Sequence, residues 1–121
     1  MDAHALLWAL DDDGELSEPA RRALAEPEND VVVSAAIIWE IEVKRAAGRL
    51  EAPADLLSTV EASRFVVIPI TAVEAITAAR LPMHHRDPFD RMLIAQAQRL
   101  DAVIVSRDRA FASYDVHQLL A

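Results

Sequence analysis

Cysteine is absent from this chain of 121 residues. Disulfides, thiolate nucleophiles and cysteine-based zinc sites are therefore excluded. Long apolar runs are absent too, since no stretch approaches the roughly 18 residues of a membrane-spanning helix. The first residues also lack the basic start and the small-residue cleavage site of a signal peptide. We therefore expect a protein that makes no membrane contact and is cytoplasmic.

The chain also has few basic residues relative to its acidic ones, so its net charge is −8 at pH 7. This argues against a module that coats nucleic acid, which normally presents a basic surface. It does not exclude an enzyme that acts on nucleic acid, since a divalent cation held by several carboxylates reverses the local field. Acidity of this size also favours a basic partner, although in many proteins it serves solubility alone.

The order of apolar and polar segments indicates the fold class. Apolar residues make up 53% of the chain and fall in short blocks, and the length fits a single domain over residues 1–121. Buried strands are predicted at residues 31–34, 65–70, 102–106 and 116–119, and helices at residues 17–26, 35–47, 54–61, 71–80 and from residue 88 onward. This alternation predicts an α/β fold of three layers, with a mainly parallel sheet flanked by helices.

The start of the chain departs from this pattern. An open α/β domain usually begins with a buried strand, but Met1 and Asp2 lead directly into the helical sequence HALLWAL. We expect the first strand to be missing from this chain. A parallel sheet without it would leave backbone groups unpaired, so we expect either an upstream start or a weakened fold.

The sequence HHRDPFDRMLIAQA places one carboxylate on the apolar face of a clearly marked helix. Asp87 is assigned to the N-cap and Pro88 to the first helical position. Asp90 then shares a face with residues 93, 94 and 97, all of them apolar. Burying an ionised carboxylate costs several kcal/mol, in order of magnitude, unless it is paired or binds a metal. The acidic run from Asp11 to Asp13, in contrast, is assigned to a solvated loop.

Three further acids are expected to converge with this carboxylate in one pocket. Asp2 lies at the mouth of the missing strand, Glu40 in the helix after residues 31–34, and Asp108 just past the strand AVIVS. With Asp90 they form a set of carboxylates that suits Mg²⁺ and water attack on a phosphodiester. Simpler interpretations remain open: a solvated terminus for Asp2, a turn at Asp108, a surface pair between Glu40 and Lys44, and a capping role for Asp90.

Two pairs of ring side chains need an interpretation. His84 and His85 are adjacent on a predicted loop, and adjacent loop residues rarely point at one ion. We therefore predict that they are not metal ligands and that they touch a phosphate instead. Trp8 and Trp39 lie at helical positions where a face is buried, which predicts packing in the core.

Serines and arginines surround the predicted acid cluster in sequence. Ser34 and Ser106 end strands near it, and helix capping or turn bonding accounts for them, with holding an acid as the alternative role. Four arginines neighbour the acids and are candidates for contacts with a phosphate backbone: Arg86, Arg91, Arg107 and Arg109.

Five sequence blocks together resemble a known family. They are DAHALLWAL from Asp2, VSAAIIWEIEVKRAAGRL around Glu40, PITAVEA from Pro69, HHRDPFDRMLIAQAQ around Asp90 and IVSRDRAF around Asp108. In this order they resemble a PIN-domain ribonuclease of the VapC type. The resemblance implies a PIN-like fold and the toxin of a type II toxin–antitoxin system, an endoribonuclease that cuts RNA of the tRNA or rRNA class with Mg²⁺ or Mn²⁺. It also implies a VapB-like antitoxin, a homodimer, and metal-binding catalytic roles for Asp2, Glu40, Asp90 and Asp108.

Single residues argue against two other protein families with a similar fold. Phospho-acceptor receiver domains share a lysine late in the chain that contacts the phosphoryl group. The one lysine in this chain is Lys44, which lies in an early predicted helix. A haloacid-dehalogenase-like phosphatase would need a second Asp two residues after Asp2, where this chain has His4. The remaining alternative is a weakened or inactive PIN module that acts by binding RNA or protein. Ala3 keeps it open, because the family usually has Thr or Ser there.

Overall fold

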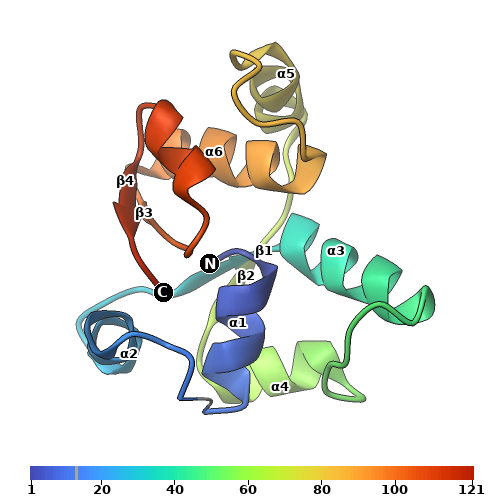
Figure 1. The fold of residues 1–121 in the computed structure, drawn as a ribbon, viewed down its shortest axis with the longest axis vertical. Coiled ribbons are helices and arrows are strands. Elements are labelled where there is room, and N and C mark those ends of the chain that lie inside the picture. The colour runs from blue at the N-terminus through green and yellow to red at the C-terminus, as the bar shows by residue number, and fades with distance from the viewer. Residues whose placement is uncertain (13) are drawn as a thin grey trace.

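The computed structural model describes residues 1–12 and 14–121. In chain order the elements are α1 (Ala3–Leu10), α2 (Glu18–Ala25), β1 (Val32–Ser34), α3 (Ala35–Ala46), α4 (Leu56–Ala62), β2 (Val66–Ile68), α5 (Ala72–Arg80), α6 (Pro88–Leu100), β3 (Val103–Val105), the 3-10 helix η1 (Arg109–Ser113) and β4 (His117–Leu119) (Figure 1). Of the acidic run predicted to be a solvated loop, Asp11 and Asp12 are exposed, and Asp13 lies outside the described residues.

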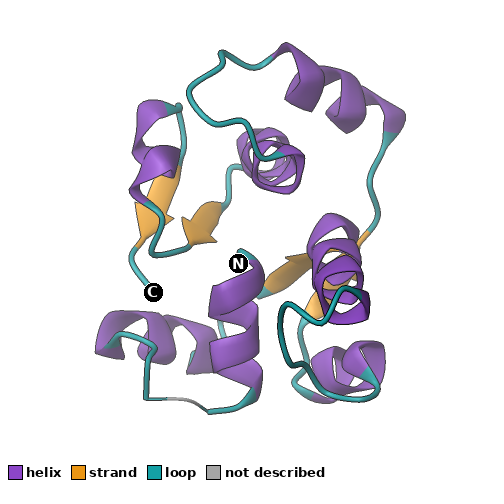
Figure 2. Ribbon diagram, turned by 45° about the vertical axis from the view of Figure 1, so that its right-hand side comes forward, coloured by secondary structure: helices purple, strands orange, loops and turns teal. Residues whose placement is uncertain are grey.

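The strands pair in parallel, which confirms the predicted α/β class. β1 pairs with β2 so that Val33 lies opposite Val67, and β3 pairs with β4 so that Ile104 lies opposite Gln118. β1, β2 and β3 lie toward the middle of the molecule with helices around them (Figure 2), whereas β4 lies at its left side in Figure 1. Within the described ranges the strands form two separate two-stranded sheets, instead of the single sheet that the sequence predicts.

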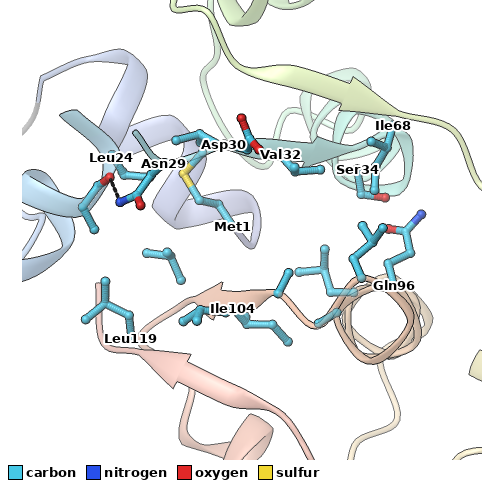
Figure 3. Close-up of a pocket in the computed structure, with 18 residues that line it drawn as sticks. Met1, Leu24, Asn29, Asp30, Val32, Ser34, Ile68, Gln96, Ile104 and Leu119 are labelled. Carbon is cyan, nitrogen blue, oxygen red and sulfur yellow. Dashed lines mark hydrogen bonds between the residues drawn. The ribbon is translucent and has the colours of Figure 1, made fainter. Parts of the chain in front are cut away.

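The break between the two sheets coincides with the start of the chain. As expected, Met1 and Asp2 lead straight into α1, and the Asp2 amide donates to the carbonyl of Val105 at 3.2 Å, where β3 ends. Behind Met1, between β1 and β3, lies a cavity of about 330 Å³. Its walls include Val32 and Ile104, and Met1 lies between them (Figure 3). This apolar cavity occupies the position that a central strand would take.

Several predicted helix starts are confirmed by their caps. Ser17 caps α2 through its side chain, and Asp87 accepts hydrogen bonds from the first amides of α6, whose first residue is Pro88. At α5, Thr71 and Glu74 form a reciprocal capping box, with Thr71 N–H donating to Glu74 at 2.9 Å. Short polar side chains at these positions satisfy amides that have no partner within the helix.

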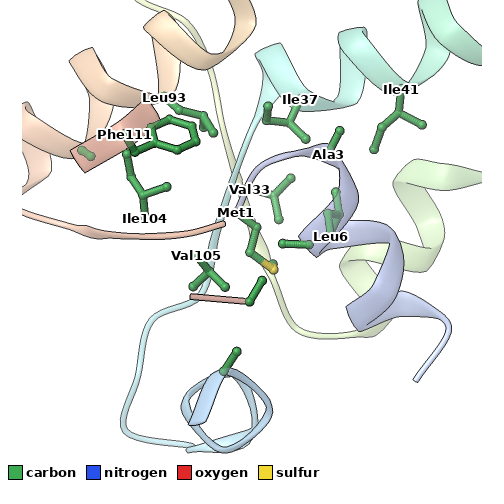
Figure 4. Packing of buried hydrophobic residues seen from close by; sticks show 14 of the residues in the cluster. Met1, Ala3, Leu6, Val33, Ile37, Ile41, Leu93, Ile104, Val105 and Phe111 are labelled. Carbon is green, nitrogen blue, oxygen red and sulfur yellow. The ribbon is translucent and has the colours of Figure 1, made fainter. Parts of the chain in front are cut away.

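A continuous hydrophobic core joins the elements that carry the predicted acids. Leu6 of α1, Val33 of β1, Ile37 of α3 and Phe111 of η1 are fully buried in it (Figure 4). Ile94 of α6 is fully buried in it too. Contacts run from α1 to α3 and from α3 to α6. The core therefore fixes these helices relative to one another, and with them the side chains at their starts.

The prediction that both tryptophans pack in the core is wrong for Trp39. Its side chain is 60% exposed and contacts Phe89 edge-on, with ring centroids 5.1 Å apart. The buried face of α3 carries Ile37 and Ile41, and Trp39 lies halfway between them on the other side of the helix. Trp8 is partly buried against the core, as expected.

Within residues 1–12 and 14–121, no helix combines the length and the apolar composition that crossing a bilayer requires.

Candidate metal centre

The four predicted acids come together at one pocket of about 180 Å³. Asp2 is the N-cap of α1, Glu40 lies in the middle of α3, Asp90 in the first turn of α6, and Asp108 caps the 3-10 helix. The starts of α1, α3 and α6 face the same central region of the molecule (Figure 1). Residues that are more than 100 positions apart in sequence thus share one site.

Asp2 is held in place through both carboxylate oxygens. Its Oδ1 accepts the amide of Ala5 at 3.0 Å, and its Oδ2 accepts the hydroxyl of Ser106. The same Ser106 oxygen accepts the amide of Asp108 at 3.0 Å, so this buried serine links two of the acids. The alternative role of holding an acid is therefore correct for Ser106, whereas Ser34 caps α3.

Glu40 carries a buried oxygen that lacks a hydrogen bond. Its side chain pairs with Lys44 through Oε2, with a distance of 2.6 Å to Nζ. The expected i,i+4 pair therefore exists, but it does not lie on a wet face, because Glu40 is only 4% exposed. Its Oε1 is buried and has no hydrogen-bond partner among the described residues. An unsatisfied buried carboxylate oxygen is costly, and a cation in the pocket would satisfy it.

Asp90 lies in an electrostatic environment that opposes its negative charge. Burial is the largest effect that raises its pKa, and the charges of Asp87, Glu40 and Asp2 raise it further. His85 works in the other direction, and the net result is a pKa of about 7. Such a carboxylate is about half protonated near neutral pH, and a nearby positive charge would favour its ionised form. The prediction that this carboxylate needs a partner is confirmed by its contact with His85.

The prediction that the two histidines are not metal ligands stays a prediction, but His85 does lie beside two of the acids. Its Nε2 lies 2.8 Å from Oδ2 of Asp90 and 3.3 Å from Oδ2 of Asp108, and these three atoms form a cluster able to hold a metal ion. His84 points elsewhere and contacts the ring of Tyr114 edge-on. The two side chains do diverge, as expected of neighbours on a loop, but one of them reaches the acids.

Sequence reasoning did not place His85 beside the acids, because the position of this residue depends on a loop. The hydroxyl of Tyr114 accepts the amides of His84 and His85 at 3.1 and 2.8 Å, and it donates to the carbonyl of Pro82 at 2.6 Å. This tyrosine lies 29 residues from His85. The available signal was the spacing of five residues between His85 and Asp90, across the cap of α6.

The candidate arginines differ in what they can reach. Arg91 is only 6% exposed, and its guanidinium donates to the carbonyls of Leu81 at 2.8 Å and Pro82 at 3.0 Å, among others. It supports the loop before α6 and is not free to contact a phosphate backbone. Arg107 lines the pocket and stacks over Trp8, 4.3 Å from the ring centroid. The remaining two, Arg86 and Arg109, are exposed.

The donor set fits a divalent metal ion. Carboxylate oxygens are the groups that Mg²⁺ and Mn²⁺ prefer. The unsatisfied Oε1 of Glu40 and the raised pKa of Asp90 both indicate that the pocket lacks positive charge. Lys44 and Arg107 bring cationic groups to the same pocket, but Lys44 leaves Glu40 Oε1 unpaired.

Comparison with known proteins identifies the family. No curated protein matches the sequence significantly. The profile of the PIN domain family matches residues 1–116, nearly the whole chain. PIN domains are generally metal-dependent nucleases. Together with the parallel α/β fold and the pocket of carboxylates, this match places the chain in the PIN domain family.

Proposed function

We propose that the chain is a divalent-metal-dependent endoribonuclease and the toxin of a toxin–antitoxin pair. The observation that carries the nuclease part is the single pocket lined by Asp2, Glu40, Asp90 and Asp108, in which Glu40 Oε1 is buried and unpaired among the described residues. Family membership supports hydrolysis of a phosphodiester. The toxin role and the RNA substrate are supported by the resemblance of the sequence blocks to VapC-type proteins.

In this proposal the four acids hold Mg²⁺ or Mn²⁺ and are the catalytic residues. Such an ion lowers the pKa of a bound water and neutralises charge that develops on the phosphate. Ser106 keeps Asp2 and Asp108 in position, and Glu40 contributes its free oxygen. These carboxylates would otherwise repel an RNA backbone, which makes the ion a condition for binding as well as for the reaction.

Two side chains at the pocket favour a phosphate substrate. Lys44 and Arg107 line it beside the acids, and both remain partly accessible. Charge-assisted hydrogen bonds from such groups bind phosphate oxygens and position the backbone. The exposed Arg86 and Arg109 extend this positive charge around the site.

The partners are proposals as well. A VapB-like antitoxin is expected to be basic where it meets this protein, because the net charge of −8 attracts positive segments. Homodimerisation is proposed from the family resemblance alone. Co-purification with the product of a neighbouring reading frame tests the first proposal, and light scattering of the purified chain tests the second.

The alternative function is a PIN module with weak or no activity that acts by binding RNA or protein. The observation in its favour is Ala3, which lines the pocket where the family usually has a hydroxyl. The Ser106 hydroxyl that bonds Asp2 weighs against it, since it supplies a hydroxyl to the first acid from another part of the chain.

Cleavage of labelled tRNA and rRNA fragments tests the nuclease proposal. We expect cleavage with Mg²⁺ or Mn²⁺, its loss in EDTA, and its loss in Asp90→Asn. The reduction in Asp90→Asn should exceed the roughly 10- to 100-fold cost of losing an outer-shell partner. Asp101→Asn is the matched control, because Asp101 ends the same helix in a left-handed conformation that Asn also adopts. Cleavage that survives EDTA or Asp90→Asn would contradict the proposal.

A further inference from the structure

His85 touches two of the pocket acids from outside the pocket. Its Nε2 lies 2.8 Å from Asp90 Oδ2 and 3.3 Å from Asp108 Oδ2, yet its side chain is not part of the pocket wall. The imidazole packs edge-on against the buried ring of Phe111, with centroids 6.0 Å apart. The side chain is therefore held beside the two carboxylates and is only 16% exposed.

A backbone hydrogen bond determines which ring nitrogen carries the proton. The amide of Asp87 donates to Nδ1 of His85 at 3.3 Å. A nitrogen that accepts a hydrogen bond holds no proton, so the proton of the neutral imidazole is on Nε2. Nε2 is then a donor, and the carboxylate oxygens of Asp90 and Asp108 are the acceptors that face it.

Each carboxylate keeps its second oxygen away from the imidazole. Oδ1 of Asp108 accepts the amide of Ala110 at 2.9 Å, which fixes the orientation of that carboxylate. Oδ1 of Asp90 accepts no hydrogen bond from the described part of the chain. With Oδ2 engaged by His85, the free oxygen of Asp90 is the one available to the pocket.

We propose that His85 is a positioning residue, which clamps Asp90 and Asp108 through its Nε2–H and so holds the metal centre in shape before the ion binds. This inference rests on the proposed metal-dependent function and adds a residue to it. Ligating carboxylates are commonly oriented by outer hydrogen bonds, and the loss of such a partner lowers metal affinity by roughly 10- to 100-fold. A direct bond from Nε2 to the ion would instead require the proton to move to Nδ1, at the cost of the hydrogen bond from Asp87.

Mn²⁺ binding tests this proposal by calorimetry and pulsed electron paramagnetic resonance. His85→Leu should weaken Mn²⁺ binding about 10- to 100-fold. His85→Gln keeps an N–H donor near the position of Nε2 and should restore most of the affinity. His84→Leu is the matched control, since His84 contacts Tyr114 and not the acids, and it should bind Mn²⁺ as the natural chain does. The Mn²⁺ spectrum of the natural chain should show no directly coordinated nitrogen.

Specific results would overturn the proposal. Nitrogen coupling to Mn²⁺ that is lost in His85→Gln would make His85 a ligand. Unchanged Mn²⁺ affinity in a folded His85→Leu would contradict the positioning role of His85. It would leave the proposed metal centre of the acids untouched. If His85→Leu fails to fold, the spectra of His85→Gln and the natural chain still test the proposal. Nitrogen coupling to Mn²⁺ in the natural chain that is absent in His85→Gln would contradict it. Failure of the natural chain itself to bind Mn²⁺ would overturn the proposed function together with this inference.

Discussion

At the scale of single residues, the site is a concentration of negative charge in a partly buried pocket. Asp90 has a pKa of about 7 because it is buried and faces Asp87 and Glu40. Glu40 has one oxygen bound to Lys44 and one with no partner in the described structure. Both features cost free energy without a cation and are relieved by one. The protein therefore gives up some stability at the place where we propose that it binds metal.

The raised pKa of Asp90 predicts how stability depends on pH. The folded chain holds this proton more tightly than the unfolded chain, whose Asp has a pKa of about 3.9. Protonation of Asp90 therefore stabilises the fold at low pH, and this contribution is lost as pH rises from about 4 to about 7. Without metal, the free energy of unfolding of the natural chain should fall relative to that of Asp90→Asn over this range. Urea denaturation in EDTA measures it, and a difference that is constant with pH would contradict the assignment.

The same shift predicts the pH dependence of metal binding. Protons and Mn²⁺ compete for the carboxylate of Asp90, so the affinity for Mn²⁺ should increase with pH up to about 7 and then level off. Calorimetric titrations at several pH values measure this. An affinity for Mn²⁺ that stays the same between about pH 5 and about pH 8 would show that Asp90 is not a ligand.

At the scale of elements, the decisive segment is the loop between α5 and α6. Arg91 and Tyr114 bind its carbonyls and amides from two different parts of the chain. This network places His85 beside the acids. The caps of α5 and α6 were predictable because they depend on residues within one turn. The position of His85 was not, because it depends on Tyr114 and on a buried arginine whose burial the sequence does not indicate.

Tyr114→Phe tests the role of this network. It removes one hydroxyl and leaves the ring, so the amides of His84 and His85 lose their acceptor. An unsatisfied buried donor costs about 1–3 kcal/mol; these amides are only partly buried, so we expect a loss of unfolding free energy of about 1 kcal/mol. Urea denaturation measures the loss, and Mn²⁺ affinity should fall with it because His85 is displaced. A variant with unchanged stability and unchanged affinity would show that the loop is held by other contacts.

At the scale of the whole molecule, the sequence predicted the α/β class, the parallel pairing and the meeting of the four acids. These follow from the order of strands and helices, since parallel strands place their carboxyl ends on one edge. The split into two small sheets agrees with the expectation that the first strand is missing, because a missing central strand leaves its neighbours unpaired. The exposure of Trp39 was not predictable, because it depends on which face of α3 the neighbouring helices cover.

The cavity between the sheets gives a prediction at this scale. Adding the residues Val-Val-Val-Ile before Met1 should fill the cavity with β-branched side chains and pair the facing edges of β1 and β3. The extension also replaces the buried amino group of Met1 by an amide. Burial lowers the pKa of that amino group, so its charged form is disfavoured in the fold. We expect unfolding free energy to rise by at least about 2 kcal/mol, the order gained by burying one such side chain. Gly-Ser-Gly-Ser in the same place is the matched control and should give little gain; equal stability of the two variants would contradict the prediction.

The central claim is that Asp2, Glu40, Asp90 and Asp108 form a divalent-metal centre. The most direct measurement is a crystal structure of the protein with Mn²⁺, in which anomalous scattering locates the ion. We predict one or two anomalous peaks in the pocket, within about 2.0–2.6 Å of carboxylate oxygens that include Glu40 Oε1, the range of hard divalent cations. Full occupancy by Mn²⁺ at another place, with the pocket acids unbound, would contradict the account.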